Sequence, residues 1–333
     1  MIHFIPLENL EERYTVLMNN IVDNSRLVKS YYPKNWKQKQ ISKGEFLDIE
    51  RTIEFKAKQL QIISQAFQKG QVKNNDWFFF ADIFFSGLDA VRYMAELQDI
   101  RINVASFNHA GRADETDFVQ KLGSWSDDVE KGWHEVSDIV FVGSEFHKNK
   151  VANYFNINKD KIKVTGCVWN NLEAFKTYPK LKDKQDFVMF PHRLSKEKGV
   201  LDFLQIADAM PNKKFIITSS SNKECNIKLP SNVTYINNLS KRQYYMYLSE
   251  AKYYLSTAYQ ETFGYTLREA LLYNCRVVVP NDLCYKEMLP QECLYERNDL
   301  DTIKQYLTDD YKIDNKYKDL YDNSFKNMIS YLK

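Results

Sequence analysis

Residues 256–282 read STAYQETFGYTLREALLYNCRVVVPND, and this stretch decides the fold. An apolar segment, 251–255, precedes it, and a polar turn holding Glu261 and Gly264 follows that segment. Three apolar residues then recur at the i, i+3, i+4 spacing of a buried helix face: Leu267, Ala270 and Leu271. The β-branched run 277–279 predicts the next strand. Strand, loop, helix and strand in this order predict one unit of a parallel α/β sheet.

Two carboxylates lie beside this predicted turn. Glu261 falls in the loop after the first strand, and Glu269 falls within the following helix. Ligands of parallel α/β sheets bind at the carboxyl ends of strands, where helices begin. A carboxylate accepts two hydrogen bonds at once, which suits a vicinal diol of a ribose or a hexose. Two solvated surface glutamates are the alternative interpretation.

The same stretch resembles the donor site of the retaining GT-B glycosyltransferases of the Glu-x7-Glu type. Their pattern is Glu-x-Phe-Gly, four more residues, then Glu-Ala, and it matches residues 261–264 and 269–270 here. The resemblance implies that Glu261 holds the donor sugar and Glu269 the donor ribose. It places Thr262, Phe263 and Gly264 in the donor site. Two glycines usual in the family are Thr262 and Asn274 here.

A cationic motif upstream strengthens this resemblance. The predicted strand 187–191 is followed by HRLSKEKG at 192–199. The family pattern is Gly-Arg-Leu, then Glu-Lys-Gly, so Arg193 and Lys198 match, and His192 stands where the family has glycine. By resemblance, Arg193 and Lys198 neutralise the diphosphate of a nucleotide sugar, for which the family uses no metal. Two cations near a helix start suit a diphosphate leaving group. Two surface cations are the alternative.

The N-terminal part is similar to phage-encoded glycosyltransferases thought to act on modified DNA bases. The resemblance rests on a predicted first strand at 2–5, followed by Pro-Leu-Glu at 6–8 and Arg-Tyr-Thr at 13–15. A second signature follows at 110–118, where Ala-Gly precedes an aspartate and an Asp-Phe pair. This likeness implies a 5-hydroxymethyl pyrimidine in DNA as acceptor, and it suggests acceptor-side roles for Glu8 and Arg13. A local ion pair at a helix start is the competing interpretation of those two residues.

A polar loop after the predicted strand 102–107 is the main acceptor-side candidate. It carries an imidazole, a guanidinium and carboxylates at the carboxyl end of a strand: His109, Arg112, Asp114 and Asp117. We expect His109 and Asp114 to act in catalysis, with Asp114 orienting or deprotonating the acceptor hydroxyl. Asp82, near the end of the predicted strand 77–85, joins them because a carboxylate in an apolar run needs a partner or a cleft. A structural histidine and a helix cap are the alternatives for His109 and Asp82.

Residues 24–44 contain no acidic residue and several cations interleaved with aromatic residues. This composition suits contact with a phosphate backbone and with stacked bases. The candidate contact residues are Lys34, Trp36 and Lys37. A solvated lysine-rich loop is an equal alternative.

The chain has 333 residues, a formal net charge of +2 and five scattered cysteines. Length predicts two domains, and the cysteines indicate a reducing compartment. We expect residues 1–170 to form an acceptor-binding Rossmann-like domain and 171–310 a nucleotide-sugar-binding one, the two facing a cleft. Residues 311–333 would form a helix that packs back across both.

No apolar run is long enough to span a membrane, and no signal peptide is evident. We therefore expect a cytoplasmic protein, in the host cell if it is phage-encoded.

The predicted activity is retaining transfer of a hexose from a nucleotide diphosphate sugar, with UDP the expected nucleotide. It would need neither metal nor other cofactor, and no stable membrane association is expected. Two alternatives remain open: transfer to a bacterial surface glycan or lipid-linked sugar, and a non-catalytic role in binding nucleic acid or glycan.

In the N-terminal half, we also predict a helix at 47–67 with Ile53 among its core contacts.

Overall fold

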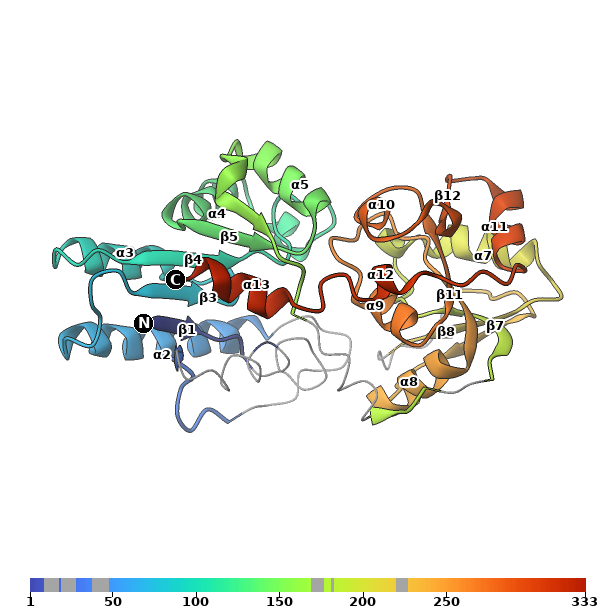
Figure 1. Ribbon diagram of the computed structural model, residues 1–333, viewed down its shortest axis with the longest axis horizontal. Coiled ribbons are helices and arrows are strands. Elements are labelled where there is room, and N and C mark those ends of the chain that lie inside the picture. The colour runs from blue at the N-terminus through green and yellow to red at the C-terminus, as the bar shows by residue number, and fades with distance from the viewer. Residues whose placement is uncertain (9–17, 19–27, 38–47, 169–176, 181–182, 220–226) are drawn as a thin grey trace. The chain divides into compact units, whose positions relative to one another are not determined.

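The computed structural model describes residues 1–8, 18, 28–37, 48–168, 177–180, 183–219 and 227–333. The chain divides into two units (Figure 1). Unit 1 comprises Met1–Trp169 together with Asn323–Lys333, and unit 2 comprises Asn170–Asp322. Residues 323–333 therefore belong to the unit that contains the N-terminus.

Unit 1 contains a six-stranded sheet in the order β2-β1-β3-β4-β5-β6, and all neighbouring strands run parallel. The strands are β1 (Ile2–Ile5), β2 (Val28–Ser30), β3 (Trp77–Phe80), β4 (Asn103–Phe107), β5 (Ile139–Val142) and β6 (Ile162–Val164). The helices are α2 (Ile49–Gln68), α3 (Leu88–Glu96), α4 (Trp125–Val136), α5 (Glu145–Phe155) and α13 (Ser324–Tyr331), with the 3-10 turns η1 (Phe118–Lys121) and η2 (Lys159–Lys161). The strand order reverses between β1 and β3, because β2 lies on one side of β1 and β3 on the other.

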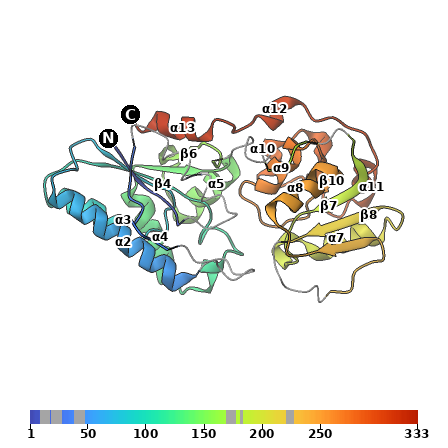
Figure 2. The same cartoon turned by 90° about the horizontal axis from the view of Figure 1, so that it is seen from below.

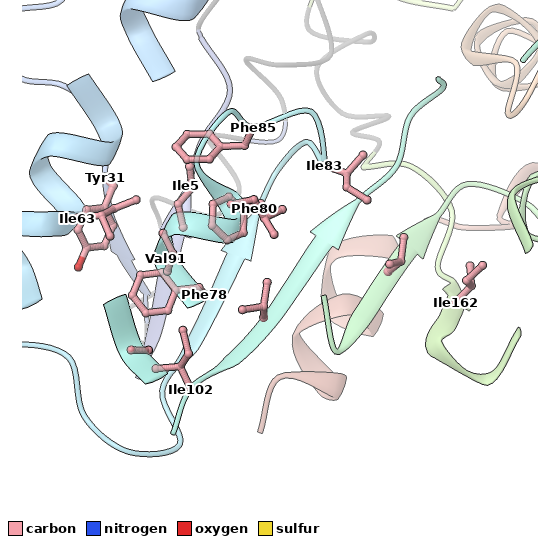
Figure 3. Close-up of a cluster of buried hydrophobic side chains, with 14 of the residues drawn as sticks. Ile5, Tyr31, Ile63, Phe78, Phe80, Ile83, Phe85, Val91, Ile102 and Ile162 are labelled. Carbon is pink, nitrogen blue, oxygen red and sulfur yellow. The ribbon is translucent and has the colours of Figure 1, made fainter. Parts of the chain in front are cut away.

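Side-chain alternation along β3 gives unit 1 a core on each face of its sheet. Phe78 and Phe80 belong to a cluster with residues of α2, α3 and α5 (Figure 3). Phe79 points to the opposite face, where its ring lies 5.7 Å from that of Phe141. Tyr331 of α13 contacts Phe141 on that face, and Figure 2 shows α13 across the sheet from α2, α3 and α4. Each phenylalanine buried in this way contributes about 1.5–3 kcal/mol to folding.

Unit 2 contains a second six-stranded sheet, also parallel, in the order β12-β11-β10-β7-β8-β9. The strands are β7 (Gln185–Phe190), β8 (Lys214–Thr218), β9 (Val233–Ile236), β10 (Ala251–Leu255), β11 (Arg276–Pro280) and β12 (Leu294–Tyr295). The helices are α7 (Val200–Asp208), α8 (Lys241–Glu250), α9 (Tyr265–Leu272), α10 (Tyr285–Met288), α11 (Leu300–Tyr306) and α12 (Asn315–Lys318), with the 3-10 turns η3 (Lys196–Lys198) and η4 (Gln291–Cys293). This is the strand order of the dinucleotide-binding Rossmann fold, which reverses between β7 and β10.

Helices cover both faces of the second sheet. Phe203 and Ile206 of α7 and Ile303 of α11 share one core cluster with Val188 of β7 and Leu255 of β10. The residues that alternate with these in the strands point to the other face, where α8 and α9 also contribute buried side chains. The predicted strand 251–255, helix and strand 277–279 are all present, and Leu267, Ala270 and Leu271 are buried as the periodicity predicts.

Two expectations for unit 1 were wrong, and one strand was missed. The strand predicted at 77–85 ends at Phe80, because the Asp82 carboxylate accepts a hydrogen bond from the Phe84 N–H and turns the chain out of the sheet. Ile53 is 47% exposed, since α2 buries the face that carries Phe55 and Ile63. The strand β2 was missed because it is a short, polar edge strand within the basic stretch.

Candidate functional site

The donor motifs predicted from the sequence meet at the point where the strand order of unit 2 reverses. Arg193 and Lys198 follow β7, and Glu261 and Gly264 follow β10, the strand paired in parallel with β7. Parallel α/β sheets bind ligands at this position, because the loops after the two strands diverge there. The topology therefore brings together two motifs that lie more than 60 residues apart in sequence.

Hydrogen bonds to backbone carbonyl groups hold the two loops together. The Thr257 hydroxyl donates to the carbonyl oxygens of Lys198 and Gly199, at 3.0 and 2.8 Å. The N–H groups of Tyr259 and Gln260 both donate to the Glu197 carbonyl. Gly199 has a φ of +65°, and a Cβ atom there would lie 2.1 Å from the Thr257 carbonyl oxygen. Glycine is required at this contact for both reasons.

Lys198 and Glu261 form the charged centre of the site. The Lys198 ammonium donates to Glu261 Oε2 at 3.1 Å and to the Gln260 carbonyl at 2.9 Å. The other carboxylate oxygen, Oε1, accepts the Gly264 N–H at 3.0 Å. Burial favours the neutral acid, but the Lys198 charge and the hydrogen bonds from Lys198 and Gly264, together with His192, outweigh burial and lower the pKa of Glu261. The site thus holds an ionised carboxylate against an ammonium at the start of α9.

The other predicted donor residues surround this pair. Gly264 is the N-cap of α9 with a φ of 75°, which favours glycine. Phe263 is buried against the rings of Tyr265 and Tyr321, and it anchors the loop that also contains Thr262. Arg193 differs from Lys198, since its side chain is 62% exposed and pairs with Glu197 at 2.7 Å.

Glu269 lies one turn into α9 and accepts two hydrogen bonds from α8. The hydroxyls of Tyr244 and Tyr245 donate to its Oε2 and Oε1, at 2.6 and 2.9 Å. Burial raises the pKa of Glu269, while these hydrogen bonds oppose that rise. Nothing in the sequence indicated the role of these tyrosines, because a hydroxyl contact between helices leaves no signal in residue spacing.

Two departures from the family pattern have a structural explanation. His192 turns inward, with Nε2 3.3 Å from the Tyr254 hydroxyl, which is in turn 2.9 Å from the Thr266 hydroxyl. Burial lowers the pKa of His192 to about 3, so its imidazole is neutral at pH 7. Asn274 has a φ of 59° at the turn after α9, a left-handed position that asparagine tolerates.

Unit 1 places a second polar group at its own point of strand reversal, after β1 and β3. Glu8, after β1, is buried and accepts the indole N–H of Trp36 at 2.9 Å, with Arg51 Nε 3.6 Å away. Asp82, after β3, is half-buried. Lys56 of α2 donates to the Phe84 carbonyl and interacts electrostatically with both carboxylates, although burial lowers its pKa. Helix periodicity gave no reason to select Lys56.

The loop after β4 contains residues of two kinds. His109 lies beside Asp82, and its Nε2 is 2.9 Å from the Ala81 carbonyl, so Nε2 carries the proton. Asp114 is completely buried and pairs with Lys150 of α5 at 2.9 Å. The structure therefore favours a structural role for Asp114, and its predicted action on the acceptor stays a prediction.

Arg112 and Asp117 also have partners within unit 1. The Arg112 guanidinium pairs with both oxygens of Asp127, at 2.9 and 3.1 Å. Asp117 caps η1 by accepting the Val119 N–H, and burial together with nearby carboxylates raises its pKa to about 6. Beneath the loop, Glu130 accepts the Arg112 N–H at 2.9 Å, and burial raises the pKa of Glu130 to about 8.

The basic stretch is described only in part. Trp36 lies over α2, with its ring centre 4.4 Å from the Arg51 guanidinium and 4.7 Å from the Lys58 ammonium. This packing covers the indole and favours a structural role for it. Lys34 and Lys37 are exposed. Arg13 lies outside the described residues.

Comparison with known proteins finds a family model that resembles the second unit. Residues 171–327 match the family model of Glycosyl transferases group 1. This match spans just under half of the chain and nearly all of unit 2, so unit 2 is similar to this family.

A relative and several solved structures resemble the whole or part of the chain. The tRNA-queuosine alpha-mannosyltransferase of Drosophila melanogaster is 27% identical over 180 residues, which are 50% of this chain and 46% of that protein. The chain thus matches less than half the length of the fly protein. Sucrose-phosphate synthase from Thermosynechococcus elongatus has a TM-score of 0.65 at 13% identity, over 99% of this chain and 94% of that one. A lipopolysaccharide outer core galactosyltransferase has a TM-score of 0.62 at 14% identity, over 99% of both chains.

These structural likenesses, with the two parallel sheets, confirm the predicted GT-B fold. Among the residues that the structure describes, no three histidine, cysteine or acidic side chains are grouped to bind a metal ion. Within the same residues, no helix has the length and apolar character needed to cross a membrane.

Proposed function

We propose that the protein transfers a hexose, with retention, from a nucleotide diphosphate sugar to a hydroxyl acceptor. The observation that carries the proposal is the Lys198–Glu261 pair at the strand reversal of unit 2, the unit that resembles the group 1 glycosyltransferases. The solved structure of S. aureus TarM, with a TM-score of 0.53 at 15% identity over 83% of this chain and 56% of that one, contains UDP. UDP is therefore the first nucleotide to test.

The proposed chemistry assigns a task to each donor residue. The bond between C1 of the sugar and the diphosphate oxygen breaks, and its electron pair leaves with the diphosphate. Lys198 and the exposed Arg193 balance the charge that develops there. The acceptor oxygen forms the new bond to C1 and loses its proton, which the departing diphosphate can accept. Glu261 holds sugar hydroxyls, and Glu269 holds the ribose. No metal ion is needed in this scheme because two cations stand at the leaving group.

For the acceptor, we favour a 5-hydroxymethyl pyrimidine in DNA. Glu8, Asp82 and His109 gather at the strand reversal of unit 1, where a small polar group could bind. Lys34 and Lys37 are exposed cations of the same unit that could contact phosphates. A base within a duplex is hidden, so the enzyme would have to flip it out or act on single strands.

A modified tRNA nucleoside is the second candidate acceptor. It is favoured by the name of the fly relative, an enzyme that mannosylates tRNA queuosine. Both candidates are hydroxyls on a modified nucleoside, so the same unit 1 groups would serve either one. A surface glycan or a lipid-linked sugar is a further class of acceptor, and a protein that binds without catalysis is the remaining alternative.

One experiment separates these possibilities. The protein is incubated with UDP- or GDP-linked hexoses and, in parallel, with DNA containing 5-hydroxymethyl pyrimidines, unmodified DNA, queuosine-containing tRNA and a glycan acceptor. Nucleic acids are digested to nucleosides for mass analysis. A hexose-sized gain on the hydroxymethylated base alone supports the favoured acceptor, and the same gain on queuosine supports the second. Transfer to the glycan alone removes nucleic acid, and absence of both transfer and nucleotide release refutes the enzymatic proposal.

A further inference from the structure

Glu269 is held on both of its carboxylate oxygens by neighbouring tyrosines. The Tyr244 hydroxyl lies 2.6 Å from Oε2, and the Tyr245 hydroxyl lies 2.9 Å from Oε1. All three residues belong to unit 2, so the arrangement is complete within one compact unit. The resemblance to known families accounts for Glu269 but assigns no role to either tyrosine.

The surrounding structure fixes the positions of both hydroxyl groups beside Glu269. A capping box between Ser240 and Gln243 starts α8 one residue before Lys241 and so sets the helical register of both tyrosines. The Tyr245 ring is buried and packs 5.6 Å from the ring of Tyr273, which follows α9. The hydroxyls remain donors at neutral pH, because burial and then the Glu269 charge raise the pKa of Tyr244 well above its usual value.

A carboxylate offers about four acceptor positions, two on each oxygen. The tyrosines occupy one on each oxygen and leave one on each for another donor. Two acceptor positions on one carboxylate match the two hydroxyls of a cis-diol. The tyrosine hydrogen bonds also favour the charged form of Glu269, which burial disfavours.

We propose that Tyr244 and Tyr245 are positioning residues that hold Glu269 as an oriented anion for the 2′,3′-diol of the donor ribose. This inference rests on the proposed function and deepens it. It extends the proposed donor site to two residues of α8 and predicts that their hydroxyls contribute to discrimination between ribose and 2′-deoxyribose. The tyrosines act through Glu269 and do not touch the reacting atoms.

The test is a thermodynamic cycle in which a tyrosine hydroxyl of the protein and the 2′-hydroxyl of the nucleotide are removed separately and together. Calorimetry measures binding of UDP and 2′-deoxy-UDP to wild type, Tyr244→Phe and Tyr245→Phe, and the GDP pair is used if GDP binds more tightly. We expect Tyr244→Phe to weaken UDP binding about tenfold, as for loss of a hydrogen bond to a charged group, and to weaken 2′-deoxy-UDP binding much less. Tyr247→Phe, on the same helix but outside the Glu269 contact, is the matched control and should bind both nucleotides as wild type does.

The pH dependence gives a readout that a purely structural role would not change. Without the Tyr244 hydrogen bond, Glu269 should have a higher pKa. As the pH is lowered, UDP binding to Tyr244→Phe should therefore begin to weaken at a higher pH than UDP binding to wild type does. Equal weakening of both nucleotides, or an unchanged pH profile, would overturn the inference. If wild type binds UDP or GDP but Tyr244→Phe and Tyr245→Phe match Tyr247→Phe, the inference fails alone. If wild type binds neither nucleotide and transfers no sugar, the proposed function fails with it.

Discussion

The Lys198 ammonium donates a hydrogen bond to Glu261 across 3.1 Å, although the two residues are 63 positions apart in the chain. The contact joins the loop after β7 to the loop after β10 and is the charged centre of the proposed donor site. Because neither side chain is fully exposed, with 16% and 18% of their surfaces accessible, the pair retains more of its attraction than a solvated one would.

The first prediction concerns this ammonium. Lys198→Met should lower the transfer rate about 10²–10³-fold, because a charged contact to the leaving diphosphate is lost. Lys196→Met removes an exposed cation from the same 3-10 turn and should leave the rate near that of wild type. Steady-state kinetics with the donor varied measures both variants, and equal rates for the two would contradict the assignment.

A second prediction concerns the packing of the two donor loops. Gly199 and Gly70 have nearly the same positive φ, +65° and +63°, but a Cβ atom meets Thr257 only at Gly199 and meets nothing within 4 Å at Gly70. Both alanine variants carry the backbone strain, on the order of 1–3 kcal/mol, and only Gly199→Ala adds a clash. Urea unfolding should therefore show a larger loss for Gly199→Ala, with loss of nucleotide binding. Equal losses would show that the close approach has no consequence.

The third prediction uses the pH dependence of stability. Burial raises the pKa of Glu130 to about 8, against 4.5 for an ordinary glutamate. Between these values the folded protein binds more protons than the unfolded chain, so unfolding free energy should fall as pH rises from 5 to 8. The fall should be on the order of a few kcal/mol.

Glu130→Gln keeps an acceptor for the Arg112 N–H but cannot ionise. Its unfolding free energy should therefore depend less on pH over the same window. Relative to wild type, the variant should be more stable at pH 8 than it is at pH 5. Thermal or urea unfolding at several pH values measures this difference. Parallel pH curves for the two proteins would argue that Glu130 titrates normally.

A fourth prediction separates the two interpretations of Asp114. If its role is to pair with Lys150, then Asp114→Asn and Lys150→Met should destabilise the protein by similar amounts, about 1–3 kcal/mol, and reduce activity alike. If Asp114 acts on the acceptor, Asp114→Asn should abolish transfer while Lys150→Met retains it. Unfolding and transfer assays on both variants distinguish the two cases.

The fifth prediction tests nucleic-acid binding. Replacing the exposed Lys34 and Lys37 by glutamine should weaken binding to duplex DNA and reduce the slope of log K against log salt by about 2, since each phosphate contact contributes about 0.9. The unfolding free energy should not change. An unchanged salt slope would exclude these lysines from the phosphate contacts.

The sequence by itself predicted the parallel α/β architecture and the strand, helix and strand of residues 251–279, and it offered four charged residues as donor-site candidates. Local pattern sufficed because the buried strands, such as 277–279, are apolar runs, and because the donor motifs occur in short loops beside them. The sequence could not predict β2, since a short polar edge strand has no periodicity of its own.

Tertiary structure alone decided which charged groups already have partners. The chain pattern grouped Arg112, Asp114 and His109 in one loop, yet folding pairs Arg112 with Asp127 and Asp114 with Lys150 and leaves His109 beside Asp82. The tyrosine contacts of Glu269 and the cover of Trp36 by α2 arose in the same way. The physical reason is that hydrogen bonds and ion pairs depend on distances between elements remote in sequence, whereas helices and strands are set mainly by neighbouring residues.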